Sequence, residues 1–511
     1  MAIDSPSVPP SSVRGGAAPP SSAPSAGPSP ARLTGRARLV LLVLCAAQFI
    51  VALDFSILNV ALPVLGRNLG MEQADLQWAV TAFALPSGGF LLFFGRVADL
   101  YGRRRLFLTG LALFTVASLL TTLAWDPASF LVGRAAQGLG AAAVVPTGMS
   151  LLTTTFPEGP RRERALGISG TLLSLGFTIG MVLGGGMTDT LGWRSTMGLL
   201  TAAGALVLAA APALLAESRH PRRPRLDVPG AVTVTGGLLG VIYALSTAAE
   251  RGFGGADVLF ALVGGVLLLA VFTVVESRAA EPLVSLPMLR RSTVAWGNLA
   301  GLTTFAMMSS VVFLLTLYLQ EVLKLSSLTT GLVFGVQGVL SAGAGVIAPR
   351  VIGRFGVRPT LIGSLLAQAA FTAALLGLGK SATGGAWLAV AAVSLASVAH
   401  LWVIISYGVI ATSGLPDHEQ GLATGLVTSS QQVGVTVGIP LLGALASAHM
   451  ASLRDGGAGF AESTLGGIRL GLGVDAAVVA VIAVAVALGL RTRKRGRLRI
   501  RRRRGPTRGA C

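Results

Sequence analysis

Apolar and small residues fill most of the chain in long runs, which short polar segments separate. A helix rises ~1.5 Å per residue, so each run is long enough to cross a hydrocarbon layer of ~30 Å. The pattern predicts fourteen spans, with ends defined to within a few residues: 38–62, 76–95, 106–125, 128–152, 165–187, 194–216, 229–249, 256–276, 293–318, 328–349, 359–379, 385–411, 421–446 and 470–490. An even number of spans places both chain ends on one side.

Composition agrees with the pattern. The 511 residues are 52% hydrophobic and only 12% charged, and they include 67 glycines. A soluble globular chain carries about twice that share of charge. The sequence therefore predicts an all-α polytopic membrane protein.

Positive charge is distributed unevenly between the two sides. The N-terminal arm, the even-numbered connections and the tail hold 32 of the 40 Lys and Arg residues. By the positive-inside rule, both termini lie in the cytoplasm. The net charge of +19 is thus a topology signal, and we expect no nucleic-acid partner. The basic tail, 491–511, is either a stop-transfer anchor or a segment that contacts anionic lipid headgroups.

The first 37 residues are rich in Pro, Ser, Ala and Gly, which predicts a disordered cytoplasmic arm and not a signal peptide. The chain has two cysteines, Cys45 and Cys511, and four scattered histidines without metal-ligand spacing. We therefore expect no disulfide framework, no metal and no cofactor.

Asp54 is the costliest residue of the first span. It lies about fifteen residues into the helix, past the membrane midplane, where a carboxylate costs about 2.5–3.5 kcal/mol. An ionisable residue at this depth is a functional-site hypothesis. The alternative is a structural Asp that forms hydrogen bonds at a helix contact.

Arg134 is the basic residue within a predicted span, and Gln137 follows one turn later. Helical rise places Arg134 ~7 Å inside the outer surface, at about the depth of Asp54. A buried Arg requires a carboxylate, so we infer that the two side chains face one cavity and interact directly or through water. Alternatively, Arg134 snorkels to the outer interface.

Two glycine patterns predict close approaches of the backbone. The second connection, GRVADLYGRRRL, has glycines seven residues apart and a charged cluster, which predicts a conformational switch built from Gly95, Asp99, Gly102, Arg103 and Arg104. A weaker echo, GRFGVRP, follows the tenth span and indicates two related halves. In the fifth span, Gly176, Gly180, Gly184 and Gly185 form a small-residue face for close packing of helices. The other half of the molecule is one candidate for the helix that packs there.

The second half carries neutral polar residues at membrane depth: Asn298, Gln337, His400, Tyr407, Gln431 and Gln432. We find no buried carboxylate among them, so we place proton coupling in the first half. His400 is a second proton site or a structural histidine, and Gln431 and Gln432 either line the cavity or bond across helices. The predicted substrate cavity includes Gln137, Asn298, His400, Tyr407 and Gln431.

Four strings together resemble the fourteen-span drug:H+ antiporter family of the major facilitator superfamily, which contains bacterial multidrug and antibiotic exporters. They are LDFSILNVALP, GRVADLYGRRRL, RAAQGLGAAAVVP and GFTIGMVLGGG, in that order along the chain. The resemblance implies a major facilitator fold with six-helix halves at 38–216 and 293–490, and a linker with two extra spans at 217–292. Three departures from the family pattern are Met181 in place of a proline, Leu100 in place of a basic residue, and Ser195-Thr196 after Trp193.

The resemblance implies a proton-coupled exporter of amphipathic drugs or antibiotics that works by alternating access in the bacterial cytoplasmic membrane, as a monomer. Asp54 and Arg134 then couple transport to proton binding. One alternative is a transporter of an endogenous metabolite, lipid or siderophore with the same fold. A membrane-embedded enzyme lacks support, since we find no Ser/His/Asp grouping, and a non-transporting receptor has no use for the Asp54–Arg134 pair.

Overall fold

The computed structural model describes residues 35–71, 76–156, 160–217, 227–251, 254–279, 286–415 and 417–490. Within these ranges every regular element is a helix. The predicted basic tail lies outside them, as does the predicted arm except for residues 35–37, which begin the first helix. Helices dominate because a backbone in lipid must satisfy its own hydrogen bonds.

The first half of the chain forms seven helices that pack on one another. They are α1 (Gly35–Leu69), α2 (Leu76–Gly89), α3 (Leu91–Tyr101), α4 (Arg103–Thr122), α5 (Pro127–Thr155), α6 (Pro160–Leu191) and α7 (Trp193–Leu214).

The second half repeats this arrangement after a helical pair and a short helix. The pair is α8 (Val228–Arg251) and α9 (Ala256–Arg278), and the short helix is α10 (Leu286–Leu289). The second half consists of α11 (Ser292–Leu317), η1 (Tyr318–Val322), α12 (Ser327–Phe355), α13 (Val357–Ala374), η2 (Leu375–Gly377), α14 (Ala382–Thr412), α15 (Asp417–Asp455) and α16 (Phe460–Gly489).

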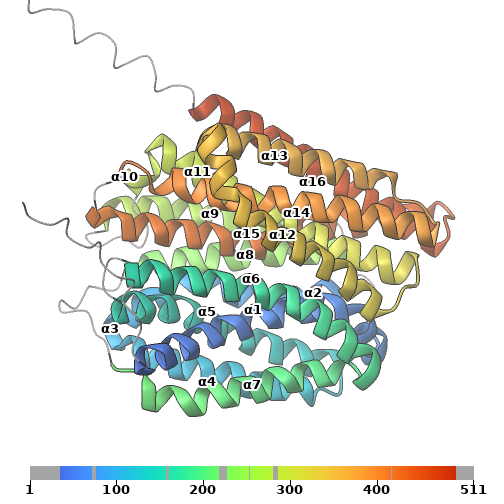
Figure 1. Ribbon diagram of the computed structural model, residues 1–511. Helices are drawn as coiled ribbons and strands as arrows, with labels where there is room; N and C mark the ends of the chain where they lie inside the picture. Colours follow the sequence, from blue (N-terminus) through green and yellow to red (C-terminus); the bar gives the residue numbers. More distant parts are fainter. Residues whose placement is uncertain are drawn as a thin grey trace, which may run out of the picture.

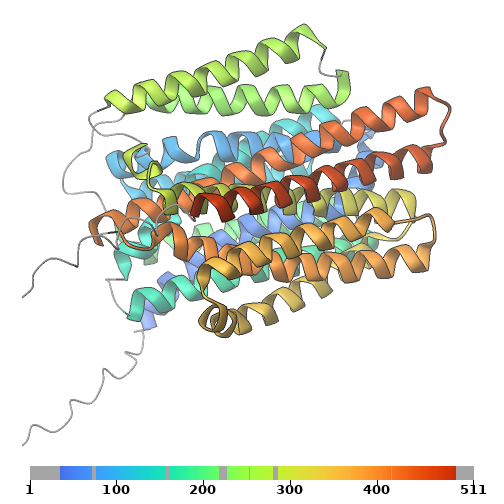
Figure 2. The same cartoon turned by 90° about the horizontal axis from the view of Figure 1, so that it is seen from above.

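The two halves lie side by side as two layers (Figure 1). The bundle has a terminal face, where α1 begins and α16 ends, and an opposite distal face. Seen from above, α8 and α9 lie along one edge of the bundle (Figure 2). There α8 packs against both α2 and α15, so it contacts both halves.

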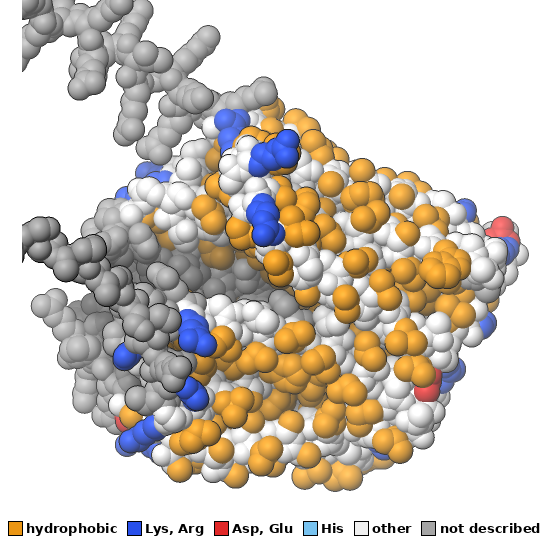
Figure 3. Space-filling model, in the orientation of Figure 1, with side chains coloured by type: hydrophobic (Ala, Val, Ile, Leu, Met, Phe, Trp, Pro, Cys, Tyr) orange, Lys and Arg blue, Asp and Glu red, His pale blue; other side chains and the backbone are white. Residues whose placement is uncertain are grey.

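In the part of the chain that the structure describes, thirteen helices are long and apolar enough to cross a membrane. The second predicted span, 76–95, is instead divided into α2 and α3, which break between Gly89 and Leu91. Pro86 and two glycines just before the break are a sequence signal for it. Hydrophobic side chains cover much of the flank (Figure 3), as expected for a lipid-facing surface.

Two predicted span boundaries are corrected by the structure. The predicted switch loop is helical up to Tyr101, and Gly102 alone turns the chain into α4 with a φ of 110°. Near the C-terminus, α15 extends to Asp455 and α16 begins at Phe460, so the expected long connection shrinks to four residues.

Candidate functional site

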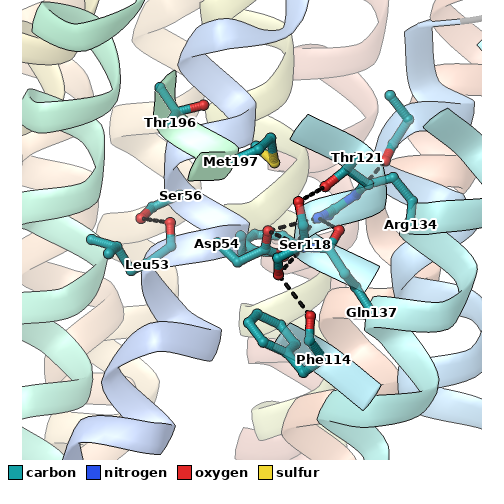
Figure 4. A network of polar contacts seen from close by, with 12 residues as sticks. Leu53, Asp54, Ser56, Phe114, Ser118, Thr121, Arg134, Gln137, Thr196 and Met197 are labelled. Carbon is teal, nitrogen blue, oxygen red and sulfur yellow. Dashed lines mark hydrogen bonds and ion pairs between the residues drawn. The ribbon is translucent and has the colours of Figure 1, made fainter. Parts of the chain in front are cut away.

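Asp54 on α1 and Arg134 on α5 form an ion pair in the interior of the first half (Figure 4). Nη1 of Arg134 lies 2.7 Å from both carboxylate oxygens of Asp54. Both side chains have no exposed surface. The two residues predicted to interact are therefore in direct contact, and Arg134 does not snorkel to the surface.

The remaining guanidinium atoms hold Arg134 against α2 and within α5. Its Nε donates to the carbonyl of Ala79 at 3.2 Å, and its Nη1 also donates to Oε1 of Gln137 at 3.0 Å. The guanidinium lies over the Phe83 ring, 4.5 Å from its centroid. Nη2 has no hydrogen-bond partner among the described residues.

Gln137 connects the ion pair to α4. Its Nε2 donates to the hydroxyl of Ser118 at 2.8 Å and lies 3.5 Å from Oδ1 of Asp54. The Ser118 hydroxyl in turn donates to the carbonyl of Phe114. Gln137 was predicted to line a substrate cavity, but the structure buries it fully within this network.

Two buried charges are costly to remove from water, and each compensates the other only while both are present. Removing one partner of such a pair typically costs about 3–5 kcal/mol. Both charges are therefore needed for the buried network to be stable in this arrangement.

The predicted small-residue face of α6 packs mainly within its own half. Three of these glycines lie so close to α1 that a larger residue would not fit. A Cβ atom would meet Phe49 at Gly176, Ser56 at Gly180 and Ile57 at Gly184. Gly185 instead abuts the backbone of Ser327 on α12, in the other half. The glycines therefore fix α1, which carries Asp54, and also bring the two halves together.

The predicted switch residues lie where α3 meets α4 at the terminal face. Arg104 donates to the carbonyl of Pro212 at 2.7 Å, and a side chain on Gly102 would meet the carboxylate of Glu217. These contacts are with the C-terminal end of α7 and the residues after it, in the same half. Arg103 also lies here, whereas Gly95 lies about two turns earlier on α3, against Pro146 of α5. The side chain of Asp99 is outside what the structure describes.

The predicted cavity residues of the second half form interhelical hydrogen bonds. Gln431 bonds the hydroxyl of Tyr407, and Asn298 accepts from Ser430 at 2.9 Å. His400 Nδ1 lies 2.8 Å from the hydroxyl of Thr304, which donates to Gln368 at 2.7 Å. Sequence reasoning missed Thr304 and Gln368, although both are polar residues within predicted spans.

Asp475 corrects the prediction that the second half has no buried carboxylate. It lies midway along α16, and its side chain is fully buried. The predicted span began at residue 470, which placed Asp475 near the membrane edge, whereas α16 begins ten residues earlier. The cause is that polar residues such as Ser463 and Thr464 continue the helix beyond its apolar segment.

The halves touch closely at the distal face and separate towards the terminal face. Near the distal face, Gly331 and Gly338 of α12 have no room for a side chain because Met181 and Thr178 of α6 lie against them. Arg67 also pairs with Glu321 at 2.7 Å, and Gln320 donates to the carbonyl of Val60.

Further along the same two helices, towards the terminal face, positions for side chains on Gly170 of α6 and Gly343 of α12 face open space. The close glycine contacts between α6 and α12 therefore lie near the distal face, whereas the described glycines of these helices nearer the terminal face make no such contact.

Comparisons with known proteins identify relatives along most of the chain. A family model described as Major Facilitator Superfamily matches residues 44–439. The cephamycin export protein CmcT of Amycolatopsis lactamdurans is 39% identical over 426 residues, which are 80% of this chain and 85% of that protein. The puromycin resistance protein pur8 of Streptomyces alboniger is 36% identical over 454 residues, with 86% and 87% covered.

A third relative is the probable actinorhodin transporter of Streptomyces coelicolor, 32% identical over 446 residues that cover 84% of this chain and 76% of that protein. Among solved structures, an auto inhibited POT family peptide transporter superposes with a TM-score of 0.67 at 14% identity, covering 89% of this chain and 97% of that chain. This structural likeness concerns the fold alone.

Proposed function

The chain belongs to the major facilitator superfamily, and from this premise we propose that it is a proton-coupled exporter of amphipathic antibiotics or drugs. Relatives named for cephamycin export, puromycin resistance and actinorhodin transport support a small-molecule substrate of this class. We expect a monomer in the bacterial cytoplasmic membrane. The excess of Lys and Arg supports a cytoplasmic location for the terminal face.

The buried ion pair is the observation that carries the proton coupling. A proton that reaches Asp54 cancels its negative charge and leaves the guanidinium of Arg134 buried without a counter-charge. Because an uncompensated buried charge is costly, the protonated protein favours a different arrangement of α1 and α5. Loss of the proton restores the pair. Asp54 is then the proton-binding residue and Arg134 is its positioning partner.

Alternating access follows from the closed distal face. For the cavity to open outwards, the α6–α12 glycine contacts and the Arg67–Glu321 pair must separate while the terminal ends of the same helices approach. A proton that moves inward across about 150 mV delivers roughly 3.4 kcal/mol. This energy supports a substrate gradient of about a few hundredfold, at 1.4 kcal/mol per decade.

Dye efflux from proteoliposomes with an imposed pH gradient tests the proposal. We expect the wild-type protein to move a cationic amphipathic dye against its gradient and the Asp54→Asn variant to lose uphill transport. Asp455→Asn, which changes an exposed carboxylate at the end of α15, is the matched control and keeps wild-type coupling.

Two results would contradict parts of the proposal. Uphill transport that persists in Asp54→Asn with unchanged pH dependence would remove the coupling role from Asp54. Absence of dye transport in the wild-type protein, together with flux of a native metabolite, would favour a transporter of an endogenous compound with the same fold.

A further inference from the structure

Asp475 lies on a face of α16 that is otherwise apolar or small through the membrane. The buried positions at helical spacing around it are Ile468, Gly471, Leu472, Val479, Ala483 and Val486. Fifteen residues separate Asp475 from the start of the helix and fourteen from its end, so it lies ~21 Å from either. Among these apolar neighbours, a carboxyl group contributes no more to helix packing than a leucine would.

Among the described residues, no charged group compensates Asp475. Both of its carboxyl oxygens lack a hydrogen-bond partner among the described residues. The other charged or titratable residues on α16 and on the described elements packed against it lie nearer the ends of the bundle: Arg358, Tyr318, Glu321, His449, Arg454, Asp455, Glu462 and Arg469. The nearest along α16, Arg469, directs its guanidinium to the carbonyl of Leu378, towards the distal face.

The register of α16 against α13 identifies the polar residues of α13 that lie at the depth of Asp475. Arg358 bonds the carbonyl of Ala487 near the terminal face, and Arg469 bonds that of Leu378 near the distal face. The helices are therefore antiparallel, and Asp475 is level with Thr372, with Gln368 one turn away.

Both neighbours on α13 are themselves incompletely bonded. Thr372 and Gln368 are fully buried, and the Thr372 hydroxyl and Gln368 Nε2 lack partners among the described residues. Three buried polar side chains with unused hydrogen-bonding capacity, one on α16 and two on α13, thus occur at about the same depth.

We propose that Asp475 is a second proton-binding residue, protonated in this conformation, which releases its proton to water when the second half rearranges during transport. An isolated carboxylate in apolar surroundings is neutralised by a proton rather than left charged. The protonated acid matches the neutral polar groups of Thr372 and Gln368. The inference rests on the proposed antiport function and adds a second proton to its cycle.

Transport stoichiometry tests the proposal. In proteoliposomes whose membrane potential is clamped at zero, two coupled protons support about a 100-fold dye gradient per pH unit, and one supports about a 10-fold gradient. We expect Asp475→Asn to lower the steady-state gradient from the first value to the second. Glu462→Gln changes an exposed carboxylate of the same helix and leaves the gradient unchanged.

The outcome separates this inference from the proposed function. Loss of uphill transport in Asp54→Asn together with a wild-type gradient in Asp475→Asn would overturn the role of Asp475 and leave Asp54 as the coupling residue. A wild-type gradient with unchanged pH dependence in Asp54→Asn would contradict the proposed function instead. Flux that depends on Na+ and not on pH would also overturn the proton assignment.

A measurement on the unmodified protein covers the case in which Asp475→Asn does not fold. Dicyclohexylcarbodiimide reacts with protonated carboxyl groups in apolar surroundings, and mass spectrometry locates the adduct. We expect modification of the peptide containing Asp475 at neutral pH, with less modification as the pH is raised. An unmodified Asp475 in protein that is labelled elsewhere would overturn the proposal.

Discussion

The two halves of the molecule share a packing scheme but differ in the charges they bury. Gly102 and Gly356 both join consecutive helices through a single residue with positive φ. Two residues later, Arg104 and Arg358 each bond a carbonyl in the last helix of their own half. The repeated contacts indicate that both halves derive from one structural unit.

Corresponding glycine contacts align the interiors of the halves. Gly180 abuts the carbonyl of Leu53 in the first half, as Gly438 abuts that of Ala306 in the second. The next residue is Asp54 in one case and Met307 in the other.

Capping residues align α5 with α14 in the same way. Asp126 caps α5 and Ser381 caps α14, so Arg134 corresponds to Ala389 and Gln137 to Ala392. The second half thus has an apolar replica of the ion-pair site.

This difference between the halves separates the residues that helix packing requires from those that proton coupling is proposed to require. Glycine contacts and single-residue junctions recur because two similar bundles need them to pack. The ion pair does not recur, so the second half has this packing scheme without it. The buried carboxylate of the second half, that of Asp475, lies instead on α16, which is not the counterpart of α1.

The largest predicted effect comes from making the first half resemble the second. Arg134→Met leaves Asp54 buried without a cation, and Asp54→Met leaves Arg134 without an anion. Each single variant should lose about 3–5 kcal/mol of stability and all uphill transport. The double variant should regain most of the stability, because neither charge remains, but none of the coupling. Thermal unfolding in detergent and pH-driven dye transport measure the two properties.

The same experiment can show that Asp54 and Arg134 do not stabilise the first half as a pair. If the double variant is as unstable as the two single losses combined, the pair does not act as a unit, and other contacts of Arg134, such as the one to Ala79, determine the stability of this region.

Counting residues along the apolar runs gives the membrane depth of each polar residue, and this is why the sequence alone predicted the Asp54–Arg134 contact. Both Asp54 and Arg134 interrupt long apolar runs, and counting residues places them at one level. Asp475 was missed because the same counting started at the first apolar residue after Arg469. Which helix a glycine faces is set by tertiary packing, so the contact of Gly185 with the second half could not be read from spacing alone.

A smaller effect concerns the contact between the halves. Gly331→Val places methyl groups against the backbone of Met181 in the other half, and overpacking of this kind costs about 1–3 kcal/mol. The distal face should then open more often, with faster hydrogen exchange at the distal ends of α6 and α12. Gly343→Val is the control, because it lies on the same helix but faces open space. Equal effects of both substitutions would contradict closure at the distal face.

The smallest predicted effect distinguishes the two helix caps. Hydrogen bonds from the side chain and backbone N–H of Ser129 hold the pKa of the Asp126 carboxyl below its usual range. A lowered pKa in the folded state means that Asp126 stabilises the protein above its unfolded pKa of about 3.9, and that this contribution disappears as the pH falls through the lower folded value. Ser381 caps α14 without a titrating group, so its contribution does not change with pH.

Exchanging the caps tests this contrast. Asp126→Ser keeps a capping hydroxyl, so stability near neutral pH should change little, while the difference from wild type should shrink further in acid. Ser381→Asp should introduce the same acid-dependent loss in the second half. Unfolding temperatures measured across the acid range give both differences. A parallel offset at every pH would mean that the carboxylate of Asp126 contributes only through its shape, and that the two caps are equivalent.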